Sequence, residues 1–192
     1  MNITKDIKYW NDFYKNKNIL KIECSDFCLF VMDFFKNINI VNVIDCGCGN
    51  GRDSFQLKNK YLVDAVDNCG FIPKNEENLN FMNDNFISIN KKKYNLVYSR
   101  FTFHSITNEE HQLFLETINE NTYLAIEARS IKGEDEFVYH GKTHYRNYIG
   151  IEYIKKLLLE NEFEILFLKE EKGFAVYKNE DPYCIRVICL KK

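Results

Sequence analysis

The sequence predicts an α/β fold with a mainly parallel sheet, helices on both faces and an antiparallel C-terminal edge. First, short apolar and β-branched runs alternate with helical patterns after residue 41. Second, a glycine-rich turn, Gly47-Cys48-Gly49-Asn50-Gly51, directly follows the first of these runs. Third, Asp181-Pro182 supplies a turn between the last two runs, which indicates antiparallel pairing. A length of 192 residues fits a single domain, 1–192.

Two helical segments are expected before the sheet. The first is strongly aromatic, and the second begins at Ser25, a favourable N-cap residue. We therefore expect residues 1–40 to form a helical lid region over a core of residues 41–192. The aromatic residues of the first segment are Tyr9, Trp10, Phe13 and Tyr14, and the apolar face of the second is Phe27, Phe30, Val31, Phe34 and Phe35.

The core follows a strand, helix, strand order. Thr107-Asn108-Glu109-Glu110 has the form of a capping box, so a helix is expected from there to about residue 118, and apolar spacing predicts another helix from Ile151. The expected strands cover 41–44, 62–66, a weak strand ending at Phe81, 96–99, 123–126, 163–168, 174–177 and 184–190.

Composition narrows the possible partners. A net charge of −2 provides no general field for a polyanion, and no apolar run approaches the roughly 18 residues of a membrane span, so we expect neither nucleic acid nor membrane as a partner. The N-terminus has no apolar signal-peptide core, which predicts a cytoplasmic protein. The seven cysteines contain no C-x-x-C pair and are interpreted as small buried hydrophobic residues, with no metal site.

The glycine turn indicates a nucleotide cofactor. A dinucleotide loop reads G-x-G-x-x-G, but here the third glycine comes one residue early and Arg52 takes its place. Asp45, just before the glycines, suits a ligand that carries an ammonium and a sulfonium. These residues resemble the first motif of class I S-adenosylmethionine-dependent methyltransferases, an acid followed by G-x-G-x-G. The resemblance implies a Rossmann-like, seven-stranded sheet over nearly the whole chain, with a tight loop without ligand as the alternative.

Further cofactor residues are expected after the next two strands. Asp67 lies about twenty residues beyond the glycines, where such folds place an acid on the ribose hydroxyls; a turn carboxylate is the alternative. Asp64, in the same strand, is expected to face elsewhere. The segment from Asp84 to Phe86 is similar to the family's third motif, which implies an acid on the adenine amino group and an apolar neighbour on the ring. The predicted cofactor residues are Asp45, Gly47, Cys48, Gly49, Gly51, Arg52, Asp53, Asp67, Asn68, Asp84, Asn85, Phe86, Ser99 and Arg100.

His104 follows the fourth strand, at the place where the family brings methyl group and acceptor together. Its imidazole has an ordinary pKa near 6.5 and can accept a proton from a hydroxyl or amine at neutral pH. We therefore predict that His104 is a general base, with a histidine that orders the loop as the alternative.

A second polar group is expected to bind the acceptor. The S-R-F, E-x-R and H-Y-R segments resemble small methyltransferases associated with bacterial surface-polysaccharide decoration. Because planar guanidinium groups bind oxyanions with two hydrogen bonds, we expect a small, anionic acceptor, such as a phosphate, phosphoramidate, carboxylate or sugar-linked group; an ordinary salt-bridged surface is the alternative. A non-catalytic S-adenosylmethionine-binding protein, an NAD-dependent oxidoreductase and a methyltransferase acting on RNA or protein remain alternatives, and the oligomeric state stays open. The predicted acceptor residues are Tyr9, Tyr14, Arg129, His144, Tyr145 and Arg146.

Overall fold

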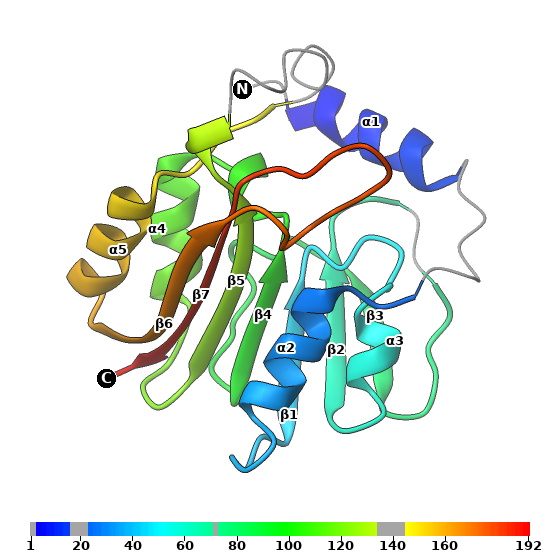
Figure 1. Ribbon diagram of the computed structural model, residues 1–192. Helices are drawn as coiled ribbons and strands as arrows, with labels where there is room; N and C mark the ends of the chain where they lie inside the picture. Colours follow the sequence, from blue (N-terminus) through cyan, green and yellow to red (C-terminus); the bar gives the residue numbers. More distant parts are fainter. Residues whose placement is uncertain (1–2, 16–22, 71–72, 134–144) are drawn as a thin grey trace.

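The computed structural model describes residues 3–15, 23–70, 73–133 and 145–192, and is built around one seven-stranded sheet (Figure 1). The strand order is β3-β2-β1-β4-β5-β7-β6, and only the pairs that involve β7 are antiparallel. This confirms the predicted Rossmann-like sheet with its antiparallel C-terminal edge. The strands are β1 (Asn42–Cys46), β2 (Leu62–Asp67), β3 (Leu79–Asn83), β4 (Leu96–Arg100), β5 (Tyr123–Arg129), β6 (Phe163–Glu171) and β7 (Cys184–Lys191).

Helices cover both faces of the sheet, and α1 lies across its upper end in Figure 1. Helices α2 and α3 pack on one face, and α4 and α5 pack on the other, each over a separate apolar core. A buried side chain of Leu, Ile, Val or Phe contributes about 1.5–3 kcal/mol, so both cores hold the strand ends firmly in place. The helices are α1 (Ile3–Lys15), α2 (Asp26–Phe34), α3 (Ser54–Leu57), α4 (Asn108–Glu116), α5 (Ile151–Glu160) and the short 3-10 helix η2 (Phe103–Ser105).

Both predicted helix starts are confirmed. The Ser25 hydroxyl accepts a hydrogen bond from the Cys28 amide at 3.1 Å. The Thr107 hydroxyl accepts from the Glu110 amide at 3.2 Å, while the Glu110 carboxylate accepts from the Thr107 amide at 2.8 Å. Each cap satisfies amides that the first helical turn leaves without a partner.

The prediction was wrong for 174–177, which is not a strand. This segment belongs to the connection between β6 and β7, and Figure 1 shows that connection reaching toward α1. Gly173 has a positive φ of 85° and ends the extended conformation, and the Asp181 carboxylate accepts from the Gly173 amide at 2.6 Å. The loop is therefore closed by its own side chains.

Strand β5 is longer than predicted and runs to Arg129 rather than to residue 126. Glu127 and Arg129 therefore belong to the sheet and pair with Arg186 and Cys184 of β7. Alternate residues of a strand point to the same face, so Glu127 and Arg129 share one side of the sheet. This extension places both charges beside the carboxyl end of β4.

Among the described residues, no helix is long and apolar enough to span a membrane. Within that part of the chain, no group of three or more His, Cys, Asp or Glu side chains is placed to hold a metal ion.

Candidate functional site

The glycine turn follows β1 at the carboxyl end of the sheet. Gly47, Gly49 and Gly51 have φ values of 76°, 54° and 76°, the left-handed conformation that glycine adopts without steric cost. A Cβ on Gly47 would overlap the Thr102 methyl group, and a Cβ on Gly51 would overlap the Phe81 ring. Two of the three glycines therefore make room for side chains of the protein itself.

Gly49 instead faces helix α1. A Cβ at this position would overlap the phenol of Tyr14, and the Asn11 side chain accepts a hydrogen bond from the Gly70 amide at 2.5 Å. Burial, and then the charge of Asp67, raise the pKa of Tyr14 well above its ordinary value, so the phenol stays neutral. Helix α1 therefore contacts the chain at two points, Gly49 after β1 and Gly70 after β2.

Asp67 ties the glycine turn to the end of β2. Its carboxylate accepts from the Gly49 amide and from the Cys69 amide, both at 2.8 Å. The Asp84 amide donates to the Asp67 carbonyl at 3.2 Å, so the ends of β1, β2 and β3 adjoin. A carboxylate has about four acceptor positions, and Asp67 uses two of them here. It retains the capacity to accept two ribose hydroxyls.

Asp45 is buried at the end of β1, where its carboxylate accepts from the Ser54 hydroxyl at 2.5 Å. Burial raises the pKa of Asp45 to about 7, the Ser54 hydrogen bond opposes this, and Asp53 and Asp67 add to it. A cation placed beside Asp45 would favour the charged carboxylate. The site is therefore electrostatically suited to a positively charged ligand group.

Two predicted cofactor residues bind the chain instead. The Asp53 carboxylate accepts from the Ser25 amide and hydroxyl, each at 2.7 Å, and from the Tyr98 hydroxyl at 2.6 Å. Arg52 donates through Nε to the Glu23 carbonyl at 2.5 Å. Asp53 and Arg52 therefore hold the start of α2 against the turn, and we revise their predicted roles from cofactor binding to positioning.

Some of the remaining predicted cofactor residues are buried or bonded within the chain, and others lie at the open edge of the sheet. Phe86 is buried in the core on the α4 and α5 face, and Ser99 is buried and hydrogen-bonded to the Thr102 hydroxyl, so both are structural. The Asn85 side chain accepts from the Ile87 amide at 2.9 Å. At the open edge lie Asn68, Asp84 and the half-buried Cys48.

Arg100, at the end of β4, is held by a carboxylate that the sequence analysis did not include in the site. Glu127 is 0% exposed and binds the Nε of Arg100 at 2.8 Å and the Nε of Arg186 at 2.7 Å. Burial raises the pKa of Glu127 and the two guanidinium groups oppose that rise. Arg186 also packs on Phe174, with its guanidinium carbon 4.2 Å from the ring centroid. The lone charge of Arg186 inside an apolar strand was the signal for this network.

The geometry at His104 favours the histidine that orders the loop over the predicted general base. The side chain is 1% exposed, and its Nδ1 accepts a hydrogen bond from the backbone amide of Arg129 at 3.1 Å. In the neutral ring only one nitrogen carries a free lone pair, and here that lone pair is directed at the amide. His104 therefore positions β5 beside the loop, as the alternative interpretation held.

Arg129 and Arg146 form the cationic part of the site. Arg129 pairs with Glu180 of the β6–β7 connection at 3.2 Å. Burial, and then the positive charge of Arg129, lower the pKa of Arg146, while Tyr148, Tyr9 and Glu180 act in the opposite direction. The Nε of Arg146 is buried and has no hydrogen-bond acceptor among the described residues. An orphaned buried donor next to a second guanidinium is a place where an anion is stabilised.

The other predicted acceptor residues do not all join this cluster. Tyr145 is half-buried. Its pKa is raised mainly by burial and also by the charges of Glu110 and Glu109, so Tyr145 lies beside the start of α4. His144 lies outside the described residues.

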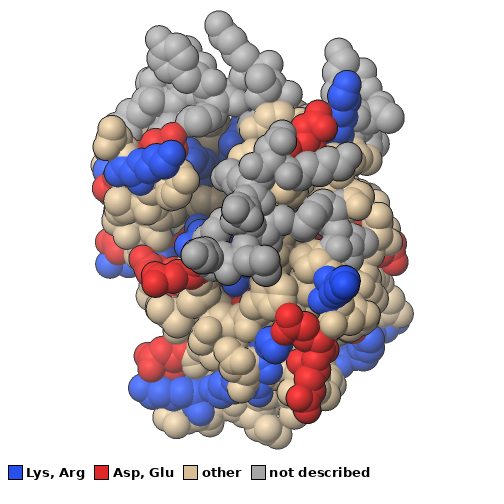
Figure 2. All heavy atoms as spheres, turned by 90° about the vertical axis from the view of Figure 1, so that its right-hand side faces the viewer, with Lys and Arg blue, Asp and Glu red and all other residues tan. Residues whose placement is uncertain are grey.

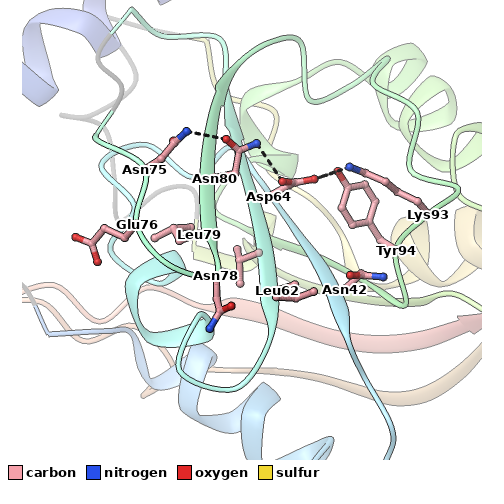
Figure 3. A pocket seen from close by; sticks show the side chains of 11 residues that line it. Asn42, Leu62, Asp64, Asn75, Glu76, Asn78, Leu79, Asn80, Lys93 and Tyr94 are labelled. Carbon is pink, nitrogen blue, oxygen red and sulfur yellow. Dashed lines mark hydrogen bonds and ion pairs between the residues drawn. The ribbon is translucent and has the colours of Figure 1, made fainter.

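A separate hollow of about 480 Å³ opens on the sheet beside β3 (Figure 3). Its centre is Asp64, which accepts from Tyr94 at 2.6 Å, Lys93 at 2.7 Å and Asn80 at 3.2 Å. Leu62 and Asn42, near the amino ends of their strands, also line it. Asp64 therefore faces away from the cofactor edge, as predicted, and the hollow is no part of the candidate site.

No protein-family model matches the chain. It is similar to malonyl-[acyl-carrier protein] O-methyltransferase 2 of Ilyobacter polytropus, with 27% identity over 157 residues. The matched region covers 69% of this chain and 58% of that protein, so the chain spans little more than half the length of its curated relative.

Solved structures share the fold. An S-adenosylmethionine-dependent methyltransferase from Anabaena variabilis has a TM-score of 0.73 at 14% identity and covers 100% of this chain and 96% of its own. The 1,6-didemethyltoxoflavin-N1-methyltransferase of Burkholderia thailandensis has a TM-score of 0.67 at 12% identity, with 100% and 86% coverage. A Methanosarcina mazei methyltransferase gives 0.66 at 14% identity, with 84% and 96% coverage. The chain therefore has the fold of S-adenosylmethionine-dependent methyltransferases.

Proposed function

We propose that the protein transfers the methyl group of S-adenosylmethionine to an oxygen of a small anionic acceptor. One observation carries the proposal: an edge that suits a cation, with Asp45 and Asp67, adjoins an edge that suits an anion, with Arg129 and Arg146. Methyl transfer from a sulfonium to an anionic oxygen requires both kinds of site side by side.

The residues of the first edge fit the cofactor. Asp67 would accept the ribose hydroxyls, Asp84 would face the adenine, and Asp45 would stabilise a positive group. When bound, S-adenosylmethionine supplies an already activated methyl group. Helix α1, with Tyr14 on Gly49, serves as the lid that excludes water.

Chemistry at this site depends on alignment more than on proton transfer. Holding acceptor and methyl group in line can supply about 7–11 kcal/mol of the barrier. A phosphate or carboxylate is already ionised at neutral pH and needs no base. This agrees with the engaged Nδ1 of His104, which favours an ionised acceptor over a neutral hydroxyl or amine.

The acceptor class follows from the arginines. Planar guanidinium groups bind carboxylates and phosphates with two parallel hydrogen bonds. The relative from Ilyobacter polytropus is named for O-methylation of malonyl-[acyl-carrier protein], which supports an oxygen acceptor. The S-R-F, E-x-R and H-Y-R segments extend the proposal to a sugar-linked phosphate, phosphoramidate or carboxylate, with a role in surface-polysaccharide biosynthesis.

The charge distribution favours a small acceptor over a polyanion. On the face beside β3, shown in Figure 2, acidic and basic side chains alternate over the described part of the surface. Binding of RNA relies on several Lys or Arg side chains along one face. Arg129 and Arg146 instead form a small local cluster at the strand ends.

Calorimetric titration with S-adenosylmethionine, and with NAD as the control, tests the cofactor. Binding of the first and not of the second supports the proposal, whereas the reverse result would assign the protein to oxidoreductases. Methyl transfer is then measured with a panel of malonate monoesters, sugar phosphates and sugar carboxylates against their neutral amides. Cofactor binding without turnover on any acceptor of the panel would favour a non-catalytic S-adenosylmethionine-binding protein.

A further inference from the structure

Phe101 has an unusual backbone conformation directly after β4. Its φ is 59°, in the left-handed region that bulky side chains rarely adopt. The other non-glycine residues with positive φ in the described part of the chain are exposed, polar residues: Asn78, Asn121, Glu162 and Lys178. Phe101 is therefore the one apolar residue among them, and it lies at the candidate site. Such outliers persist only where the surroundings hold them in place.

Three contacts impose this conformation. The Phe101 amide donates to the Glu127 carbonyl at 2.7 Å. The next residue, Thr102, places its methyl group against Gly47 and hydrogen-bonds through its hydroxyl to Ser99. The chain must turn sharply between these anchors, and the turn directs the Phe101 side chain toward the arginines.

The Phe101 ring lies beside three side chains, two that are close to it in the sequence and one from β5. The guanidinium carbon of Arg100 is 4.3 Å from the ring centroid, and that of Arg129 is 5.8 Å from it. The His104 ring meets it edge-on at 5.4 Å. Two like charges repel one another, but the face of an aromatic ring attracts each of them. The ring therefore packs against both guanidinium groups, each of which also pairs with a carboxylate, Arg100 with Glu127 and Arg129 with Glu180.

We propose that Phe101 is a positioning residue that spaces Arg100 and Arg129 for the anionic group of the acceptor; this rests on the proposed function. A carboxylate in the same place would compete with the acceptor for the guanidinium N–H groups, whereas a ring leaves them available. Arg100 uses its Nε for Glu127, and its terminal nitrogens have no partner among the described residues. The strained turn is retained because it delivers the ring to this position.

The test separates backbone strain from ring function. In Phe101→Gly the left-handed φ costs nothing, so the melting temperature should stay the same or rise, while affinity for inorganic phosphate should fall about tenfold. Phe101→Trp keeps an aromatic face and should retain phosphate affinity within about threefold. Glu162→Gly is the matched control: it has a φ of 60° but lies at the opposite end of the sheet and should leave phosphate binding unchanged.

Phosphate affinity is measured by calorimetry with and without S-adenosylhomocysteine, and cofactor affinity is measured in parallel. Unchanged phosphate affinity in Phe101→Gly overturns the inference, and so does a parent protein that binds cofactor but no phosphate. A parent protein that binds phosphate but no cofactor would instead overturn the proposed function, and the Phe101 comparison would still be decided by the phosphate titration.

Discussion

The two halves of the carboxyl edge are built differently. The cofactor half, at the ends of β1, β2 and β3, depends on backbone amides that bind nearby acids, as when Gly49 donates to Asp67 across 18 positions. The acceptor half, at the ends of β4 and β5, depends on side chains that bind each other over longer separations. Arg100 and Glu127 are 27 positions apart, and Glu127 and Arg186 are 59 apart.

This difference has an energetic consequence. A backbone amide stays in place when a side chain is changed, so the cofactor half should lose ligand affinity but little stability on mutation. In the acceptor half Glu127 balances the charges of Arg100 and Arg186, so removal of Glu127 leaves both uncompensated. Function and stability are therefore coupled in the acceptor half and separable in the cofactor half.

The largest effect is expected for Glu127→Ala. The change leaves Arg100 and Arg186 without their shared carboxylate in a buried place and should lower the free energy of unfolding by about 3–5 kcal/mol. Urea denaturation measures it. Glu160→Ala is the control, because its pair with Lys156 is exposed and should cost at most about 1 kcal/mol. An equal loss of unfolding free energy in the two variants would contradict the coupling of function and stability in the acceptor half.

Asp67→Ala should weaken S-adenosylmethionine binding by about 2–3 kcal/mol through the loss of ribose hydrogen bonds, with the protein still folded. Calorimetry gives the affinity and circular dichroism the fold. Asp64→Ala lies in the same strand but faces the separate hollow, and should bind cofactor as the parent does. If both variants bound normally, Asp67 would not belong to the cofactor half.

Arg129→Lys and Arg146→Lys should each raise the KM for the acceptor by roughly 10- to 100-fold, because lysine keeps the charge but loses the planar pair of donors. Cofactor affinity should change little. Arg52→Lys is the matched control, since Arg52 binds backbone carbonyls of the chain. If the KM for the acceptor stayed at the parental value in both Arg129→Lys and Arg146→Lys, the proposal of an anionic acceptor would be wrong.

The last prediction concerns pH. Because the pKa of Asp45 is raised to about 7 in the folded protein, its contribution to stability is present at about pH 4 and is lost as the pH rises through 7. Cofactor affinity should change in the opposite direction and increase by up to tenfold per pH unit between about pH 5 and 7, since a cation binds the ionised form. Titrations at several pH values check this, and Asp45→Asn should abolish the dependence. If the cofactor affinity of the parent protein did not change between these pH values, Asp45 would not become ionised when the cofactor binds.

Local patterns in the sequence determined most of the fold. The caps at Ser25 and Thr107, the strand and helix order, and the glycine turn each depend on residues a few positions apart, where propensity and hydrogen bonding act directly. The prediction for Asp67 rests on a similar signal, its distance from the glycines. The failure at 174–177 has the opposite cause, because strand formation there needed a partner strand that local sequence does not specify.

Only the tertiary structure decided which polar residues lie at the open edge of the sheet. Asp53 and Asp67 are both acids near the glycine turn, yet one binds Ser25 and Tyr98 from distant segments while the other stays at the open edge. His104 looks like a base in sequence, but its lone pair is used by an amide 25 positions away. A side chain's partners depend on which strands the sheet brings together, and that pairing is a property of the whole fold.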